Sequence, residues 1–200
     1  EIVNRALTKL GAERILSLTD DVKNARVMNS MFVAVRDAEL RRHNWNFAVK
    51  RASLAASTTD PDWGFDNAYP LPSDFLRLLD IDGSWSAVGL DDYIGRDNAI
   101  FRIETVGDDN IKCIVTDLSA PLLIRYTRRV TDANLMDSAY IEALACRLAV
   151  EGCESITQSN SKRDLAMREY NDAISSAILA NAIENPPSAL ADDSWVMSRL

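Results

Sequence analysis

A helical pattern that is apolar on most sides lies at 138–156, SAYIEALACRLAVEGCESI. Its clearly polar wedge, Arg147, Glu151 and Glu154, is narrow, and Ala143, Cys146, Val150 and Cys153 widen the apolar surface. A helix that is apolar on nearly every side is buried among other elements. We therefore expect 138–156 to be the central helix of the fold. Seven residues define its apolar face: Ile141, Leu144, Ala145, Leu148, Ala149, Gly152 and Ile156.

Two helices are predicted before the central one. The first covers 2–10 and stops at Gly11, because glycine tolerates the left-handed conformation that ends many helices. The second is expected to be capped by Thr19 or Asp20 and to run to about His43. Its apolar face is predicted at Val27, Met28, Met31, Phe32, Ala34, Val35 and Ala38, with Arg26, Asn29, Arg36 and Asp37 on the other side.

One further helix is predicted after the linker TQSNS. Ser161 and Asp164 have the spacing of a capping box, and Pro186 with Pro187 stops the helix near Asn185. Its inward stripe is predicted at Ala166, Tyr170, Ala173, Ile174, Ala177 and Ala180.

Between the two helical pairs, 46–131 has the pattern of strands. Strands are predicted at 46–56, 75–82 and 122–130, and a hairpin joins 99–104 to 111–116 around VGDDN. The stretch 84–97 is expected to be irregular or weakly strand-like. Two prolines hold the chain extended before the 75–82 strand. Six residues there are expected to shape the approach to the β region: Pro70, Leu71, Pro72, Phe75, Leu76 and Arg77.

This order of elements predicts an α+β fold. The two helical pairs can pack together only if the strands between them in the sequence project away as an insertion. We therefore expect a four-helix bundle with an inserted antiparallel β domain. The expected divisions are 1–45 with 132–185 for the bundle, 46–131 for the β domain, and 186–200 for a C-terminal docking tail.

Composition narrows the classes of function. The chain has 200 residues and a net charge of −8, which argues against wrapping nucleic acid and is compatible with a surface past which DNA slides. No apolar run reaches the roughly 18 residues that span a bilayer. We expect Cys113, Cys146 and Cys153 to be reduced thiols, since no close pairing is apparent.

The sequence contains few candidate catalytic or metal-binding residues. The sequence has no nucleotide-binding, metalloprotease or serine-hydrolase motif, and one histidine is too few for a histidine-based metal site. His43 is expected to interact with the dipole of the helix that it ends. The adjacent acid pairs are expected to be solvated or capping residues, and the Arg41–Arg42 and Arg128–Arg129 clusters to form ion pairs rather than phosphate contacts. We expect neither catalysis nor a cofactor.

The C-terminal segment carries apolar side chains after the Pro-Pro break. It either folds back on its own helices or docks on another subunit. Tryptophan is a frequent interface anchor, so this segment is the predicted docking site. The candidate interface residues are Leu190, Trp195, Val196, Met197 and Arg199.

Several stretches together resemble a known family. They are ALTKLGAERILSLTDD, RRHNWNFAVKRASL, YPLPSDFLRLLDIDG, LLIRYTRRV, AYIEALACRLAVEGCESITQSNSK and DDSWVMSRL. In this order they look like the tail tubular protein A family, the head-to-tail adaptors of short-tailed, podovirus-type bacteriophages. The resemblance covers essentially the whole chain and transfers no catalytic residue.

The resemblance implies a structural role in the virion tail, after assembly in the host cytoplasm. Such adaptors form a closed ring of about twelve copies, a dodecamer, between the portal protein and the tail nozzle protein, with tail fibres nearby. DNA would pass through the lumen without specific binding, and no membrane would be involved. Two other functions stay open: a glycan-cleaving hydrolase, and a scaffolding or binding protein of a bacterial host.

Overall fold

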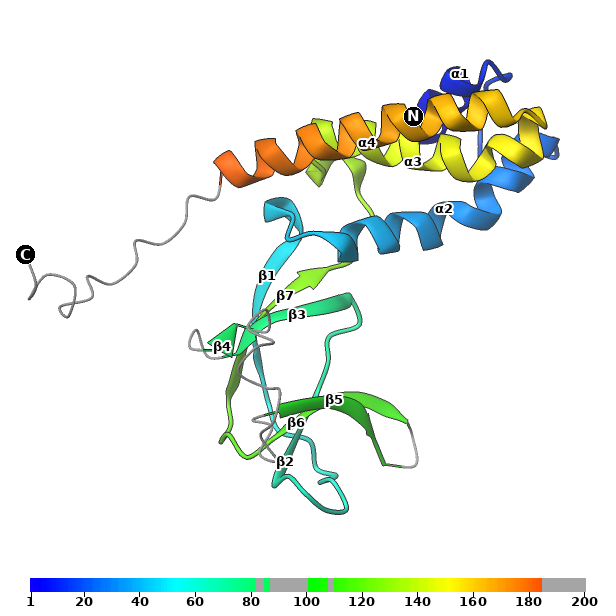
Figure 1. Cartoon of the computed structure of the whole chain (residues 1–200). Helices are drawn as coiled ribbons and strands as arrows, with labels where there is room; N and C mark the ends of the chain where they lie inside the picture. Colours follow the sequence, from blue (N-terminus) through cyan, green and yellow to red (C-terminus); the bar gives the residue numbers. More distant parts are fainter. Residues whose placement is uncertain (82–84, 87–100, 108–109, 185–200) are drawn as a thin grey trace, which may run out of the picture.

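The computed structural model describes residues 1–81, 85–86, 101–107 and 110–184. Within these residues the fold is α+β, as predicted, with four α-helices and two small antiparallel sheets. The helices lie together at one end, and the sheets extend away from them (Figure 1). Most of 84–97 and all of 186–200 lie outside the described residues, so the predictions for those stretches stay predictions.

Helix α3 (Ser138–Thr157) is the centre of the helical part. It packs against α1 (Ile2–Leu10), α2 (Lys23–Arg42) and α4 (Asn160–Ile183), whereas those three helices make few contacts with one another. Asp137 caps α3 by accepting hydrogen bonds from the backbone N–H groups of Ala139 and Tyr140. Ten of its side chains are buried, so the expectation of a central helix is confirmed: Tyr140, Ala143, Leu144, Ala145, Cys146, Leu148, Ala149, Val150, Gly152 and Cys153.

The N-terminal helices agree with the prediction in part. Helix α1 ends at Gly11, whose φ of 66° is left-handed, as expected. Helix α2 begins only at Lys23, without a side-chain cap. The predicted cap at Thr19 or Asp20 is wrong, because the Asp20 carboxylate accepts from the N–H groups of Leu16 and Ser17 in the preceding loop.

The predicted faces of α2 need correction. Arg36 was expected on the solvent side, yet it is only 6% exposed. Ala34 and Ala38, expected on the apolar face, are exposed. The inward face combines Ala25, Met28 and Leu40 with two charged residues, Arg36 and Glu39. An apolar pattern alone cannot reveal such a face, because a buried charge depends on partners elsewhere in the chain.

Helix α4 begins earlier than predicted. Its N-cap is Ser159, whose side chain accepts from the N–H of Lys162, so the predicted capping box at Ser161 and Asp164 is wrong. The predicted inward stripe is confirmed at Ala166, Tyr170, Ile174 and Ala177, which are buried. Ala173 and Ala180 are partly buried.

The first sheet has four strands in the order β1–β7–β3–β4. They are β1 (Val49–Leu54), β7 (Leu122–Arg128), β3 (Phe75–Ile81) and the short β4 (Trp85–Ser86). All neighbours are antiparallel, and Val49 lies opposite Thr127 at the helical end. Residues Asn46–Ala48, predicted as the start of a strand, instead form a 3₁₀ turn.

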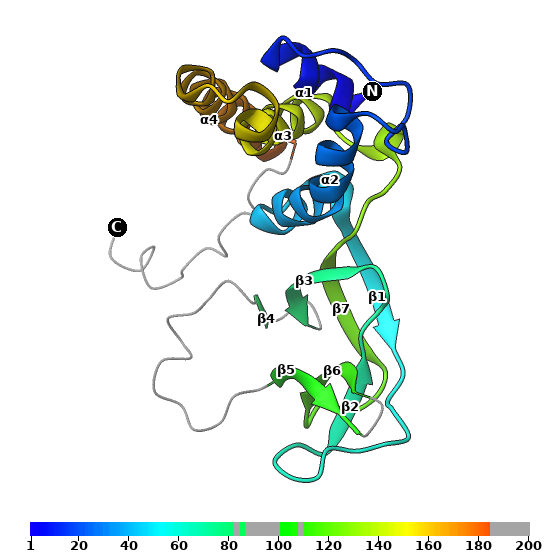
Figure 2. The same cartoon turned by 90° about the vertical axis from the view of Figure 1, so that its right-hand side faces the viewer.

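The second sheet has the order β2–β6–β5. The predicted hairpin is confirmed by β5 (Phe101–Val106) and β6 (Ile111–Thr116), which pair antiparallel. Strand β2 (Asn67–Pro70) was not predicted as a strand; it pairs with β6 from Asn67 to Pro70. The two sheets share a core of alternate inward side chains: Leu54, Tyr69, Leu78, Ile81, Ile114, Leu122, Ile124 and Tyr126. Figure 2 shows β1 and β7 running from the helices toward the second sheet.

Candidate functional site

The predicted C-terminal docking residues lie outside the described part of the chain. This applies to all five of them: Leu190, Trp195, Val196, Met197 and Arg199. Their role as an interface therefore stays a prediction.

The predicted approach to the β region joins the second sheet to the first. Pro70 ends β2 opposite Cys113, and the N–H of Leu71 donates to the carbonyl of Lys112 at 3.0 Å. The carbonyl of Pro72 accepts from the N–H of Phe75 at 3.0 Å, which forms a tight turn into β3. The phenyl ring of Phe75 then stacks on Tyr126 at 5.7 Å between centroids.

Leu76 and Arg77 connect this stretch to the helices. Leu76 is buried within the helical core, and its carbonyl accepts a hydrogen bond from Arg41 near the end of α2. Arg77 donates to the side-chain carbonyl of Asn44. Burial and the nearby Arg41 lower the pKa of Arg77 below its ordinary value. These contacts fix the start of β3 against the end of α2.

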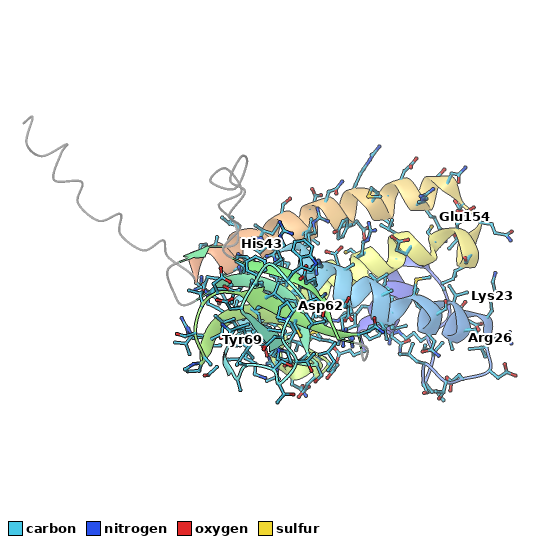
Figure 3. All side chains as sticks on the ribbon, turned by 90° about the horizontal axis from the view of Figure 1, so that it is seen from below. Lys23, Arg26, His43, Asp62, Tyr69 and Glu154 are labelled. Carbon is cyan, nitrogen blue, oxygen red and sulfur yellow. The ribbon has the colours of Figure 1, made fainter. Side chains whose placement is uncertain are left out.

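Asn181 ties the end of α4 to the same junction. Its side chain accepts from the N–H of Asn46 at 2.8 Å and donates to the carbonyl of Asn44 at 2.9 Å. Its amide nitrogen also lies 3.3 Å from Nε2 of His43, the residue that ends α2 and is labelled in Figure 3. One amide side chain thus contacts three residues of the α2–β1 connection, His43, Asn44 and Asn46.

His43 lies in surroundings that favour its neutral form. Partial burial, and then the charge of Arg77, lower its pKa from the ordinary value of 6.5. A lowered pKa does not fit the expected interaction of a charged histidine with the helix dipole, which would raise it. The neutral ring instead accepts from Asn181 and meets Trp45 edge-on at 5.1 Å.

Stability should therefore fall in mild acid. Because the pKa of His43 is lower in the folded chain, the unfolded chain binds the proton more readily. The contribution of neutral His43 is fully present above about pH 6.5 and is lost as the pH falls below it. Urea unfolding at pH 7.5 and 5.5 should show a lower midpoint at pH 5.5. His43→Gln should reduce that difference, and an undiminished difference in this variant would remove His43 as the cause.

A buried polar network joins α2, α3 and α4, and no pattern in the sequence predicts it. Glu39 is 5% exposed and accepts a hydrogen bond from the Tyr170 hydroxyl at 2.9 Å. The guanidinium groups of Arg42 and Arg147 lie over the Tyr170 ring at 5.6 and 5.4 Å. Burial, and then the bond to Glu39, raise the pKa of Tyr170 to about 12, so its hydroxyl stays a donor. The network stabilises the packing of three helices.

The two arginine clusters behave partly as predicted. Arg42 lies 3.9 Å from Glu39, and Arg129 lies 2.7 Å from Asp37. Arg41 contacts a backbone carbonyl instead. For Arg128, the described residues supply no carboxylate within ion-pair distance. Ion pairs therefore account for one arginine of each cluster.

The outer face of α4 carries large apolar side chains in contact with solvent. Leu165, Leu179 and Ile183 are 57%, 64% and 73% exposed. By helical periodicity they lie on the side opposite the buried stripe of this helix. Leu179 and Ile183 are one turn apart near its C-terminal end. The middle of that side is polar at Asp172, Ser175 and Ser176, so the exposed apolar pair of α4 is Leu179 with Ile183 at its C-terminal end.

The described residues give no support to a metal centre or a membrane span. No group of three or more histidine, cysteine or acidic side chains among them is arranged to hold a metal ion. None of the four helices is both long and apolar enough to cross a bilayer. Cys113, Cys146 and Cys153 are buried free thiols, as predicted.

Comparison with known proteins adds no assignment. No protein-family model matches the sequence, and no match is found among curated proteins.

Proposed function

We propose that this chain is a structural virion protein: a head-to-tail adaptor that forms a ring between the portal protein and the tail nozzle. The resemblance of its sequence motifs to tail tubular protein A supports this role. The order of elements predicted from the sequence, helix pair, antiparallel strands, helix pair, is also the order found, and it is one of the features on which the resemblance rests. The protein would assemble in the host cytoplasm and act in the virion tail, near the tail fibres.

The observation that carries the proposal is the exposed apolar pair of Leu179 and Ile183 at the C-terminal end of α4. Large apolar side chains at one end of a surface helix are costly in water unless a partner covers them. A ring of identical copies supplies such a partner, because each copy presents one surface to the next until the ring closes. A dodecamer is the size that the family resemblance implies.

The proposal includes a finer description of the fold. We infer that α1 to α4 form a four-helix bundle into which 46–131 is inserted as a β domain, with 1–45 and 132–185 as the bundle. The shared core of the four helices supports this division. The chain leaves the helices through β1 and returns through β7, which pair with each other. Segment 186–200 would then dock on a neighbouring subunit or on the portal.

The net negative charge of the chain is compatible with a channel through which DNA passes. A net charge of −8 disfavours tight contact with phosphates, so DNA would pass through the lumen without specific binding. No catalytic step and no cofactor belong to this role.

Assembly is the property that tests the proposal. Removing 192–200, or introducing Leu179→Glu with Ile183→Glu, should raise the concentration needed for ring or portal assembly at least about tenfold. Each change should leave the fold intact, because it alters exposed or terminal residues. Native mass spectrometry with and without portal measures the assembled species, and circular dichroism checks the fold.

Trp195→Ala is the sharper variant for the portal contact. It should weaken association with the portal, since a buried tryptophan commonly anchors an interface. Equal portal affinity would remove the docking role of Trp195. Unchanged assembly in all three variants would count against the adaptor proposal as a whole.

A further inference from the structure

A cavity of about 330 Å³ lies at the end of the β part that is remote from the helices. It is formed between residues 57–66, which connect β1 to β2, and the end of β5. Figures 1 and 2 show this connection at the bottom of the molecule, opposite the helical end. The lining residues used below are Asp60, Asp62, Trp63, Arg102 and Glu104.

The connection that forms one wall of the cavity is hydrogen-bonded to the second sheet and its flanking loop at both ends. The N–H of Ser57 donates to the carbonyl of Ala68 at 2.7 Å, and the N–H of Asp66 donates to the Asp117 carboxylate at 3.1 Å. Phe65 packs on a small separate core under the connection. Its buried members are Ala68, Cys113 and Val115. The cavity therefore exists before any ligand binds.

Trp63 exposes its indole beside this cavity. The side chain is 82% exposed, whereas Trp45 in the helical core is 1% exposed. An isolated exposed apolar side chain is common on soluble proteins. Here the indole lies beside the cavity, and an aromatic ring in that position provides a large contact area for a partner.

The charges around the cavity favour a cation. Three carboxylates, Asp60, Asp62 and Glu104, outnumber the single guanidinium of Arg102. In the part of the chain that the structure describes, none of these four side chains has a hydrogen bond or ion pair. Phosphate groups would be repelled. The hydroxyls of a neutral sugar could donate to the carboxylates, but only a cation also gains from their net negative charge. The acids are exposed, unlike the glycosidase acid that lies in an apolar pocket, so binding fits better than cleavage.

We propose that this cavity binds an arginine or lysine side chain of a partner polypeptide. The cation lies against the face of the Trp63 indole, where it is attracted by the ring quadrupole. The unpaired carboxylates accept its N–H groups in charge-assisted hydrogen bonds. A partner backbone can continue over Ile111, which is 46% exposed and lies opposite Val106 of the cavity lining. This site goes beyond the adaptor role, since it requires no ring.

The test uses the full chain and a fluorescein-labelled peptide with three arginines among glycine and serine. A matched peptide carries citrulline, which keeps the shape of arginine but not its charge. Fluorescence anisotropy should show the arginine peptide binding at least about tenfold more tightly, with the difference shrinking at high salt. Trp63→Ala and Glu104→Gln should each weaken binding about threefold to tenfold.

Glu154→Gln is the control for charge. It removes one exposed carboxylate from α3 at the end of the helices, remote from Asp62 (Figure 3), and should leave the affinity unchanged. Trp63→Phe keeps an aromatic face and should bind more tightly than Trp63→Ala. Far-UV circular dichroism confirms that each variant is folded.

Three outcomes would overturn the proposal. The first is equal binding of the arginine and citrulline peptides. The second is full affinity in both Trp63→Ala and Glu104→Gln. In the third, a neutral glucan oligomer quenches the tryptophan fluorescence of the parent chain but not of Trp63→Phe, and the arginine peptide does not bind. That result would assign the cavity to a glycan.

Discussion

Trp45→Ala should lower the free energy of unfolding by about 3–5 kcal/mol, the usual range for removing a buried aromatic side chain. Trp45 is 1% exposed. Its ring lies 5.0 Å from Tyr140 and 6.2 Å from Phe47, and its Nε1–H donates to the carbonyl of Glu39 at 2.9 Å. The substitution therefore leaves a cavity and an unpaired carbonyl at the place where the helices meet the first sheet. Urea unfolding followed by circular dichroism measures the loss.

Trp63→Ala is the matched control for this prediction. The same chemical change at a side chain that is 82% exposed should alter the free energy of unfolding by less than about 0.5 kcal/mol. Similar losses in the two variants would mean that Trp45 is not the core residue described above.

Asp37→Ala should cost about 3 kcal/mol, because it leaves a buried arginine without its carboxylate. One Asp37 oxygen accepts from Nε and Nη2 of Arg36 at 2.9 and 2.8 Å. The other accepts from Nε of Arg129, which follows β7, at 2.7 Å. The Arg36 side chain is 8% exposed and cannot recover its hydrogen bonds from water without moving. Asp37 thus joins α2 to the end of the sheet.

Asp21→Ala removes the same charge from an exposed ion pair. Asp21 is 3.0 Å from Arg26, but its side chain is 93% exposed. Exposed pairs contribute about 0–1 kcal/mol, so this variant should unfold close to the parent midpoint. The argument for Asp37 fails if both variants lose the same amount.

The sequence was most informative where one physical effect dominates. The central helix was predictable because its apolar residues surround nearly the whole axis, and α3 is buried accordingly. The β5–β6 hairpin was predictable because a short turn stands between two strand-like runs; Gly107 and Asn110 there have φ of 73° and 52°. Both signals are local, so distant parts of the chain do not change them.

The misplaced features depend on contacts between distant residues. Strand β2 ends in a proline, which argues against a strand, yet it pairs with β6 more than 40 residues later. Glu39 looks like a surface residue until Tyr170 and Arg147 from later helices meet it. Arg36 and its neighbour Asp37 look exposed until Arg129, which follows β7, contacts Asp37. Helix caps were misplaced because several neighbouring polar residues can cap, and packing selects among them.

The cavity at the far end of the β part could not be read from the sequence. Its acids come from the 57–66 connection and from β5, which are about 40 residues apart in the chain and are brought together through β6. Trp63 stands in STTDPDWGFDNAY, whose proline, glycine and acidic residues are typical of an ordinary loop. Only the exposed fraction of its side chain and the hollow beside it distinguish it from other loop residues.

The pairing of Val49 with Thr127 has an evolutionary consequence. The polypeptide leaves the helices through β1 and returns through β7 at neighbouring points, and the start of β3 adds a further contact with the end of α2. Insertions or deletions in the distal part of the sheets therefore leave the ends of the helices in place. The β part that is remote from the helices can thus change in sequence or length while the packing of the four helices is preserved.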